Sequence, residues 1–306
     1  MQMRRTTRFR ELIEATEILL LPGVHDALSA RIAAEVGYQA ITCGGYAATA
    51  SLLGAPDIAQ LSMTEMADLY ARLCDCVSLP ILADADTGYG NAVNVARTVR
   101  AFERAGVAAL FIEDQVAPKR CGHMEGKRVI PVADMVAKLK AALDARQDHD
   151  LVIMARTDAR AIEGFEAAIE RAQIYREAGA DVIFVEAPLT VDEMMRICSE
   201  VPAPCMANNV EGGKTPLLAA AQLEEIGYAA VAFPVAATYA IAQTLRRLYT
   251  VLLQSGDTAS LQKDMVGFTA FHDIVGLPQL REMERGCEGF ARDLLERLAD
   301  PERRDL

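Results

Sequence analysis

Short apolar segments alternate with longer amphipathic segments along most of the chain. The short segments span residues 18–21, 40–43, 81–85, 109–112, 151–155, 182–185, 205–207 and 230–233. They are rich in β-branched and large apolar residues and lack a polar face, which is typical of parallel strands that are buried on both sides. The pattern therefore predicts eight parallel β-strands.

The longer segments have the apolar period of helices, for example over residues 93–105, 135–145 and 165–178. Glycines that suit helix C-terminal caps follow several of them, at Gly37, Gly106, Gly179 and Gly227. Eight strands that alternate with helices predict an α/β fold of the closed (β/α)8 TIM-barrel type, which typically needs about 250 residues. An open, doubly wound sheet is the alternative. We interpret residues 1–306 as one domain.

Helical periodicity continues after the eighth predicted strand, over residues 240–253 and again around residues 282–298. Eight strand–helix units do not need these extra helices. We therefore expect residues 255–306 to form a helical C-terminal extension. Such an extension would cover one end of the barrel or contact a neighbouring subunit.

The chain is acidic, with a net charge of −12, and 52% of its residues are hydrophobic. An acidic surface repels nucleic-acid backbones and anionic lipids, so we expect no binding to nucleic acid or membranes. No stretch approaches the ~20 apolar residues of a membrane span, and the apolar run near the N-terminus is too short for a signal peptide. The seven cysteines lack the spacing of a disulfide framework, which favours reduced thiols and a cytoplasmic location.

Acidic residues gather where the predicted strands end, at the edge that carries the catalytic groups of barrel enzymes. Asp84 and Asp86 end the third strand and share one face, and Glu113 ends the fourth. Carboxylates this close repel one another unless a cation lies among them. Oxygen ligands without cysteine or histidine suit Mg²⁺, or Mn²⁺. The pattern predicts a metal site, with helix capping by these acids as the alternative.

Two further groups of residues follow the predicted strand ends. Arg156, Glu186 and Asn208 end the fifth, sixth and seventh predicted strands, so we expect them at the same rim. Cys43, Gly44 and Gly45 end the second strand. Adjacent glycines let backbone N–H groups approach an anion, although Gly-Gly is also an ordinary turn.

The loop after the fourth predicted strand contains Lys119-Arg120-Cys121-Gly122-His123. Basic neighbours lower the pKa of a thiol, so Cys121 is a candidate for proton exchange near neutral pH. An inert cysteine in a basic surface loop is the alternative. No predicted strand contains a lysine, which argues against an aldolase that forms a Schiff base.

These motifs, in this order and at these spacings, resemble the isocitrate lyase / phosphoenolpyruvate mutase superfamily. The resemblance rests on Asp-Ala-Asp-Thr-Gly-Tyr-Gly (84–90), Glu-Asp-Gln (113–115), Lys-Arg-Cys-Gly-His (119–123) and Ala-Arg-Thr-Asp (155–158). The third of these resembles the signature of the lyase branch. The similarity covers residues 9–239 and is closest to methylisocitrate lyases and to phosphonomutases of the carboxyvinyl-carboxyphosphonate phosphorylmutase type.

The resemblance implies roles for individual residues. Asp86 would bind Mg²⁺ directly, and Asp84 and Glu113 would hold it through water. The carboxylate of the substrate would meet the backbone of Gly44 and Gly45 beside Cys43, within a site that Asp57 and Gly122 also line. The remaining roles fall to the catalytic residues Cys121, His123 and Arg156 and to the substrate-binding residues Glu186 and Asn208. This sequence departs from the lyase pattern at Cys43, where serine is common, and at Tyr46, where a small residue is usual.

The resemblance implies a Mg²⁺-dependent carbon–carbon lyase. Its substrate would be a small 2-hydroxy di- or tricarboxylate, of the 2-methylisocitrate or 2,3-dimethylmalate type. The products would be a 2-oxo acid such as pyruvate and a carboxylic acid, formed through an enolate that Cys121 protonates. The sequence does not identify the initial base.

Three other functions remain as alternatives. A phosphonomutase forms a P–C bond and gives a proton-donating cysteine no obvious task. An oxaloacetate hydrolase or decarboxylase of the same superfamily is another alternative, and a non-catalytic, metabolite-binding barrel is the third. The resemblance also implies a homotetramer, built as a dimer of dimers whose subunits exchange a helix.

Overall fold

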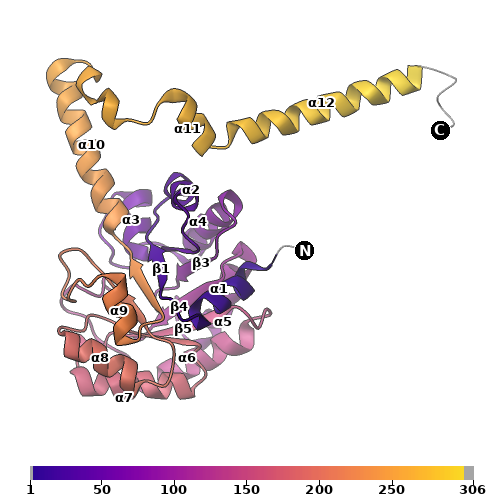
Figure 1. Cartoon of the computed structure of the whole chain (residues 1–306). Helices are drawn as coiled ribbons and strands as arrows, with labels where there is room; N and C mark the ends of the chain where they lie inside the picture. The colour runs from indigo at the N-terminus through magenta and orange to yellow at the C-terminus, as the bar shows by residue number, and fades with distance from the viewer. Residues whose placement is uncertain (1–2, 300–306) are drawn as a thin grey trace. The chain divides into compact units, whose positions relative to one another are not determined.

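The computed structural model describes residues 3–299 and contains eight short parallel strands at the centre of its larger unit (Figure 1). Their bounds are β1 (Leu19–Pro22), β2 (Ile41–Cys43), β3 (Ile81–Asp84), β4 (Ala109–Glu113), β5 (Val152–Thr157), β6 (Val182–Val185), β7 (Met206–Asn208) and β8 (Ala230–Phe233). Each lies within two residues of a predicted strand at both ends. Most of their residues are buried, because the strands are covered on both faces.

The strands form a closed barrel. Hydrogen bonds join β2 to β6 in sequence order and join β1, β8 and β7 into a second set. Two bridges connect the sets, from Gly23 just after β1 to Thr42 in β2 and from Ile183 in β6 to Cys205 before β7. Because every strand thereby has two neighbours, the predicted (β/α)8 barrel is confirmed and the open sheet is excluded.

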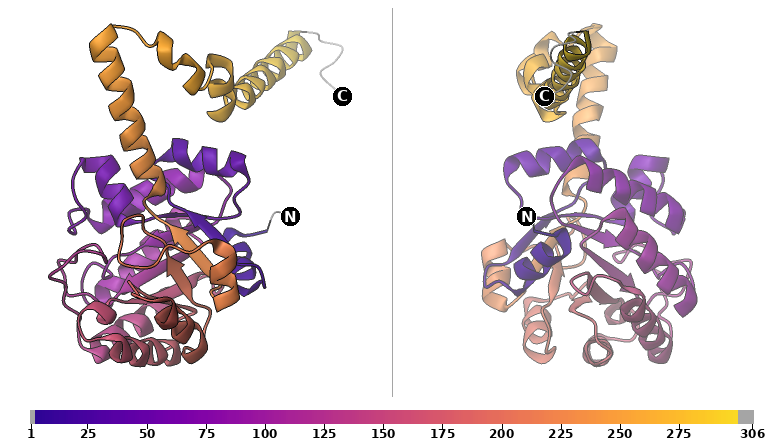
Figure 2. Two further views of the ribbon diagram at one scale, coloured as in Figure 1. Left: turned by 60° about the vertical axis from the view of Figure 1, so that its left-hand side comes forward. Right: turned by 90° about the vertical axis from the view of Figure 1, so that its right-hand side faces the viewer.

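At least one helix follows each strand, and those from α2 to α9 surround the barrel (Figure 2). They are α2 (Ala27–Val36), α3 (Gly45–Leu53), α4 (Met63–Cys76), α5 (Ala92–Ala105), α6 (Val132–Ala145), α7 (Phe165–Glu177), α8 (Val191–Glu200), α9 (Ala220–Ile226) and α10 (Ala236–Ser255), with the 3₁₀ turn η1 (Ala159–Ala161) before α7. Left-handed glycines end α2, α5 and α9, as the sequence predicts, and Gly179 lies one residue beyond the cap of α7.

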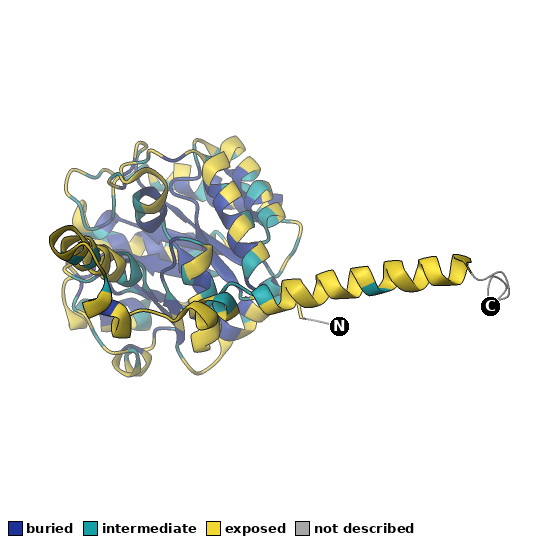
Figure 3. Ribbon diagram, turned by 90° about the horizontal axis from the view of Figure 1, so that it is seen from above, coloured by how far each residue is buried: buried dark blue, intermediate teal, exposed yellow. Residues whose placement is uncertain are grey.

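The barrel interior is filled by apolar side chains, and its N-terminal end is closed by α1 (Arg5–Glu14). Phe9, Leu12 and Ile13 of α1 belong to the same buried cluster as inward-facing strand residues such as Leu82 and Met154. A second cluster lies between the strands and the outer helices. In Figure 3 the buried strands lie inside a shell of partly exposed helices. The opposite, C-terminal end of the barrel is where the site lies.

The residues form two compact units, which divide within α10, after Leu245. The second unit contains the end of α10, the 3₁₀ turn η2 (Ala259–Asp264), α11 (Phe268–Ile274) and α12 (Leu277–Ala299). Many of its apolar side chains are exposed, among them Met283 and Phe290 of α12. Among residues 3–299, no helix is both long and apolar enough to cross a membrane.

Candidate active site

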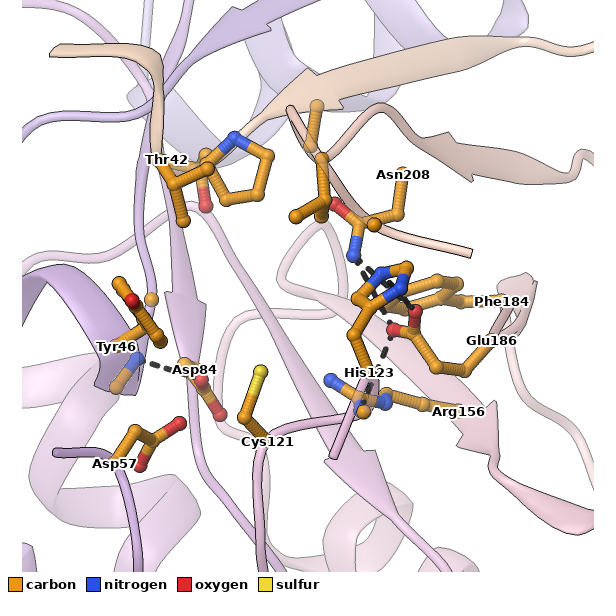
Figure 4. Close-up of a pocket in the computed structure, with 18 of the residues that line it drawn as sticks. Thr42, Tyr46, Asp57, Asp84, Cys121, His123, Arg156, Phe184, Glu186 and Asn208 are labelled. Carbon is orange, nitrogen blue, oxygen red and sulfur yellow. Dashed lines mark hydrogen bonds and ion pairs between the residues drawn. The ribbon is translucent and has the colours of Figure 1, made fainter. Parts of the chain in front are cut away.

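A cavity of about 240 Å³ opens at the C-terminal ends of the strands. Its apolar lining includes Leu82, Phe111, Phe184 and Met206 from the barrel interior. The polar lining comes from strand ends and loops. Figure 4 shows Tyr46 and Asp84 on one side of the cavity and Arg156, Glu186 and Asn208 on the other, with Cys121 between them. Most of the residues singled out from the sequence therefore meet in one place.

A buried lysine lies among the predicted metal-binding acids. Lys119 Nζ is 2.7 Å from Asp57 Oδ2 and 2.8 Å from Asp86 Oδ1. Burial lowers the pKa of Lys119, but Asp86, Asp84, Glu113 and Asp57 outweigh burial and hold this pKa well above its usual range. The ammonium group therefore stays charged and neutralises part of the cluster.

The acids do not cap the helices that follow their strands. Asn91 caps α5, and Pro131 occupies the N-cap position of α6. Asp84 instead accepts hydrogen bonds from the backbone N–H of Asp86 at 2.9 Å and of Gly45 at 2.8 Å. The capping alternative is therefore wrong for Asp84, Asp86 and Glu113.

The acid cluster carries more negative charge than its neighbours neutralise. Burial, outweighing Lys119, raises the pKa of Asp86 to about 7, and burial likewise raises the pKa of Glu113 well above its usual range. Glu113 Oε1 is buried without a hydrogen-bond partner in the described chain, whereas Asp86 Oδ1 is paired with Lys119. Asp86 also has a left-handed backbone, with φ of 47°, a conformation that aspartate tolerates and that is often found at functional sites. A cation fits this cluster.

The arrangement suits a metal that keeps most of its water ligands. Within the part of the chain that the structure describes, no three His, Cys, Asp or Glu side chains converge closely enough to surround an ion. Mg²⁺ commonly binds through one or two carboxylates and several waters. Asp84 lines the cavity, whereas Asp86 and Glu113 do not. The donor set therefore fits Mg²⁺ held by few direct ligands.

Arg156 forms the centre of a second charged cluster. Its guanidinium donates to Asp158 Oδ2 at 2.9 Å and lies 3.3 Å from both Glu113 and Glu186. Asp158 also pairs with Lys127 at 2.6 Å. Arg156 is thereby fixed between the predicted metal-binding acid Glu113 and the substrate-binding candidate Glu186. Such a cation can neutralise negative charge that develops in the cavity.

Glu186 connects several groups on the far wall of the cavity. Burial raises its pKa, but Arg156 and His123 outweigh burial and lower the pKa to about 2, so the side chain is a carboxylate. Asn208 Nδ2 donates to Glu186 Oε2 at 3.2 Å. This carboxylate leaves the amide oxygen of Asn208 able to accept from a ligand.

Cys121 faces the cavity, but its environment differs from the prediction. The basic neighbours point elsewhere, because Lys119 pairs with Asp57 and the Arg120 guanidinium donates to the Glu125 carbonyl. Burial raises the pKa of the Cys121 thiol, with Glu186 and Asp57 adding to the rise. The expectation of a lowered pKa is therefore wrong. A thiol that keeps its proton is suited to donate one.

His123 joins the Cys121 loop to two other parts of the barrel. The backbone N–H of Lys214 donates to His123 Nδ1 at 3.0 Å, so a neutral ring carries its proton on Nε2. His123 Nε2 faces Glu186 Oε1 at 3.0 Å. Gly122 packs directly against Arg156 and Glu186, where an added Cβ would come within 2.6 Å of both side chains. The loop thus packs against Arg156 and Glu186, which together with Asn208 we call the charged wall of the cavity.

The predicted carboxylate-binding segment, Cys43-Gly44-Gly45, is only partly confirmed. Gly44 and Gly45 line the cavity, and Gly45 begins α3, but its N–H is already bonded to Asp84. The Cys43 side chain does not line the cavity, because strand alternation turns Thr42 inward instead. Burial, with Asp84 and Asp26 adding to it, raises the pKa of Cys43 to about 12. The assignment of the Cys43 side chain to substrate binding is therefore wrong.

Sequence reasoning missed four residues that shape the site. The sequence shows Lys119 only as a neighbour of Cys121, because its partner Asp57 lies 62 positions away. Lys127 stabilises Asp158 from the same loop. Tyr46 and Tyr239 line the cavity from α3 and α10. The sequence does mark Tyr46, because a large residue stands there in place of the usual small one. No feature of the sequence marks Tyr239 as a site residue.

Comparison with known proteins yields closely similar relatives. The chain is 45% identical over 282 residues to 2,3-dimethylmalate lyase of Eubacterium barkeri, covering 92% of this chain and 98% of that protein. It is 42% identical to a 2-methylisocitrate lyase of Aeropyrum pernix, covering 94% and 92%. It is 44% identical to the chloroplastic carboxyvinyl-carboxyphosphonate phosphorylmutase of Arabidopsis thaliana, covering 92% and 84%.

Solved structures show the same fold. A crystal structure of 2,3-dimethylmalate lyase, a PEP mutase/isocitrate lyase superfamily member, superimposes with a TM-score of 0.89 at 33% identity and covers 94% of this chain and 96% of that chain. A phosphonopyruvate hydrolase in complex with oxalate and Mg²⁺ superimposes with a TM-score of 0.84 at 27% identity, covering 92% and 99%. The phosphoenolpyruvate phosphomutase family pattern matches residues 9–253. The chain therefore belongs to this family, within the PEP mutase/isocitrate lyase superfamily.

Proposed function

We propose that the protein is a Mg²⁺-dependent lyase that cleaves the C2–C3 bond of a small 2-hydroxy carboxylic acid of the 2,3-dimethylmalate or 2-methylisocitrate type. The products are a 2-oxo acid, pyruvate for both substrates, and a second carboxylic acid. The observation that carries the proposal is that the Cys121 thiol, whose pKa is raised by burial, faces the same cavity as Arg156, Glu186 and Asp84.

The acid cluster provides the metal site. Asp86 would be a direct ligand of Mg²⁺, and Asp84 and Glu113 would hold the ion through water. When bound, the ion supplies Lewis-acid stabilisation of negative charge on the oxygens of the 2-oxo acid. The buried, unpaired Oε1 atom of Glu113 and the raised pKa of Asp86 support this assignment, as does the Mg²⁺ in the phosphonopyruvate hydrolase complex.

The charged wall binds and orients the substrate. Arg156 neutralises the carboxylate of the departing fragment, on which charge builds as the C2–C3 bond breaks. Glu186 and Asn208 position the substrate through hydrogen bonds. Gly44 and Asp57 line the opposite side, where the substrate carboxylate lies. The apolar barrel lining excludes water from the reacting bond.

Cys121 completes the reaction by protonating carbon. A base removes the proton of the 2-hydroxyl group, the C2–O bond becomes a carbonyl, and the electron pair of the C2–C3 bond passes to C3. Cys121 Sγ then gives its proton to C3, and the proton held by the base returns the thiolate to a thiol. No atom is gained or lost overall, so the reaction needs no further reactant.

The alternative is a phosphonomutase, and the 44% identity to carboxyvinyl-carboxyphosphonate phosphorylmutase favours it. Formation of a P–C bond does not require protonation of carbon. A cavity-facing thiol with a raised pKa would then have no task, which is why we rank C–C cleavage first.

A substrate panel tests the proposal. Purified protein with Mg²⁺ is given 2,3-dimethylmalate, 2-methylisocitrate, isocitrate, oxaloacetate and phosphonopyruvate, while pyruvate, glyoxylate, oxalate and phosphate are measured. We expect pyruvate from one or both of the first two acids and no turnover after chelation. Conversion of phosphonopyruvate to phosphoenolpyruvate, seen by phosphorus NMR without any C–C cleavage, would show that the phosphonomutase is the correct reading.

The cellular setting is part of the same proposal. The protein works in the cytoplasm as a homotetramer, a dimer of dimers whose subunits exchange a C-terminal helix. The seven free cysteines support a reducing compartment. The exposed apolar side chains of α12 support burial of that helix against another subunit.

A further inference from the structure

Tyr46, Tyr239 and Glu211 form one wall of the cavity, which we call the tyrosine wall. They come from the start of α3, from α10 and from the loop after β7, and all three line the cavity. Tyr239 Oη donates to Tyr46 Oη at 3.3 Å, and the two rings meet edge to face with centroids 6.1 Å apart. The contact joins elements that are 193 positions apart in sequence.

The tyrosine wall borders the space in front of the catalytic thiol. The hydrogen bond to Tyr46, followed by burial, raises the pKa of Tyr239 to about 12, and Cys121 and Glu211 add smaller contributions. Cys121 and Glu211 line the same cavity as Tyr239. Tyr46 lies across the cavity from Arg156 in Figure 4. A further substituent on a substrate held between Arg156 and Gly44 can therefore reach this wall.

The charges around the cavity favour two carboxylates over three. The cationic side chains on its lining, Lys119 and Arg156, are already paired with acids, as is His123. The tyrosine wall adds an acid, because Glu211 has a buried Oε2 atom without a hydrogen-bond partner in the described residues. A third carboxylate placed there would meet the Glu211 carboxylate and two aromatic rings, and burying an unpaired charge is costly.

Resting on the proposed function, we infer that the tyrosine wall makes the enzyme selective for a 2-hydroxy dicarboxylate with small apolar substituents over a tricarboxylate. The two rings limit the length of the substrate, and Glu211 repels an additional carboxylate. The volume agrees, since about 240 Å³ lies below the ~300–1,000 Å³ of drug-sized sites. The methyl groups of the substrate contact the rings and the apolar barrel lining.

Turnover of two substrates tests the inference. The wild-type enzyme should have a kcat/KM for 2,3-dimethylmalate at least about 10-fold above that for 2-methylisocitrate, and Tyr46→Ala should reduce this ratio by about 10-fold or more, the usual scale for discrimination by pocket shape. Tyr239→Ala should also reduce this ratio. Glu211→Gln should lower the KM for 2-methylisocitrate, because it removes a charge that repels the third carboxylate.

The matched control is Tyr46→Phe. This variant keeps the ring and loses only the hydroxyl group, so it should keep the substrate preference. A wild-type enzyme that prefers 2-methylisocitrate would overturn the inference while leaving the lyase function in place. A ratio of the two kcat/KM values that stays at the wild-type level in Tyr46→Ala and in Tyr239→Ala would also overturn the inference.

A binding measurement separates the inference from the proposed function. Calorimetry with Mg²⁺ uses 2,3-dimethylsuccinate and tricarballylate, a dicarboxylate and a tricarboxylate that lack the 2-hydroxyl group and cannot be cleaved. We expect wild-type protein to bind only the first and Tyr46→Ala to bind both. If no hydroxy acid is turned over but this pattern holds, the proposed function is wrong and the wall is selective. If tricarballylate binds wild type and variant equally, the inference is wrong whatever the enzyme cleaves.

Discussion

His123 Nε2 lies 3.0 Å from Glu186 Oε1, and this contact joins the loop that carries Cys121 to the end of β6. Glu186 in turn faces Arg156 at 3.3 Å. The loop that carries the proposed proton donor, Cys121, is therefore linked through Glu186 to Arg156, the cation that would neutralise the departing fragment. A change in the seating of the loop should affect chemistry more than it affects stability.

Gly122→Ala tests this coupling. An added Cβ would lie 2.4 Å from an Arg156 nitrogen and 2.6 Å from the Glu186 side chain, so the loop must shift. A displacement of about 1 Å at a reacting group can cost about 10²-fold in rate, and we expect a loss of that size in kcat. Gly267→Ala is the control, because an added Cβ has nothing within 4 Å there. Equal kcat values in the two variants would contradict the proposed coupling.

Cys121→Ser tests the proton donor directly. Serine is a far weaker acid, so turnover should fall by about 10²–10⁴-fold, the usual contribution of a positioned acid, with little change in substrate binding. Reaction in D₂O should place one deuterium on C2 of the propionate released from 2,3-dimethylmalate. The exposed Cys287 supplies the control variant, Cys287→Ser. Cleavage by Cys121→Ser at a near wild-type rate would show that the catalytic acid lies elsewhere.

The pH dependence should reflect the same thiol. The donor needs its proton, and burial raises the pKa of Cys121 above its ordinary value of 9.0. Activity that depends on this proton is therefore present below the raised pKa and is lost as the pH rises through it. We expect log(kcat/KM) to stay level through pH 9 and to fall only at higher pH. An alkaline limb that begins near neutral pH would indicate a lowered thiol pKa and contradict this account.

Asp86→Asn tests the metal site. We expect it to abolish Mg²⁺-dependent turnover and to leave the melting temperature of the metal-free protein at or above that of wild type. Burial raises the pKa of Asp86 to about 7, so its ionised form is unfavourable near neutral pH, and Lys119 keeps Asp57 as a partner. Calorimetric titration with Mg²⁺ and a melting curve measure the two effects. Asp68→Asn, at an exposed position of α4, is the control.

The C-terminal helix provides a test of assembly. Exposed apolar residues of α12 follow helical spacing, at Leu280, Met283, Phe290, Leu294 and Leu298. We expect sedimentation at micromolar concentration to show an oligomer. Phe290→Glu should shift it toward smaller species, whereas Arg285→Glu, on the opposite face, should not. A wild-type monomer would contradict the proposed helix exchange.

The sequence predicted the barrel well because its strands are apolar on both faces. A short apolar segment between two helical patterns, such as residues 81–85, is typical of a buried parallel strand. The structure places β3 at Ile81–Asp84. Because both faces are apolar, the sequence does not indicate which side chains point into the barrel. Nothing in a fully apolar strand end distinguishes Thr42 from Cys43, and only the closed barrel shows that Thr42 faces the cavity.

Chemistry that depends on contacts between distant residues was harder to predict. The pKa of Cys121 was misjudged because its sequence neighbours are basic, whereas its spatial neighbours include Glu186 and Asp57. Lys119 is paired with Asp57, which lies 62 positions away. The acids at the strand ends were predictable because all parallel strands end at one rim.

Gly23 has a consequence for the entrance of the cavity. Its N–H donates to the Phe233 carbonyl at 2.9 Å while it bridges to Thr42, and a Cβ would lie only 2.3 Å from the Pro234 carbonyl oxygen. Tyr46 and Tyr239 follow these two partners by a few residues. The close backbone contact between β1 and β8 therefore contributes to the spacing of the segments that carry the two rings. A side chain at position 23 would push β1 and β8 apart and shift the segments that carry the two rings. Selectivity against larger acids would then depend on main-chain geometry as well as on the side chains of the tyrosine wall.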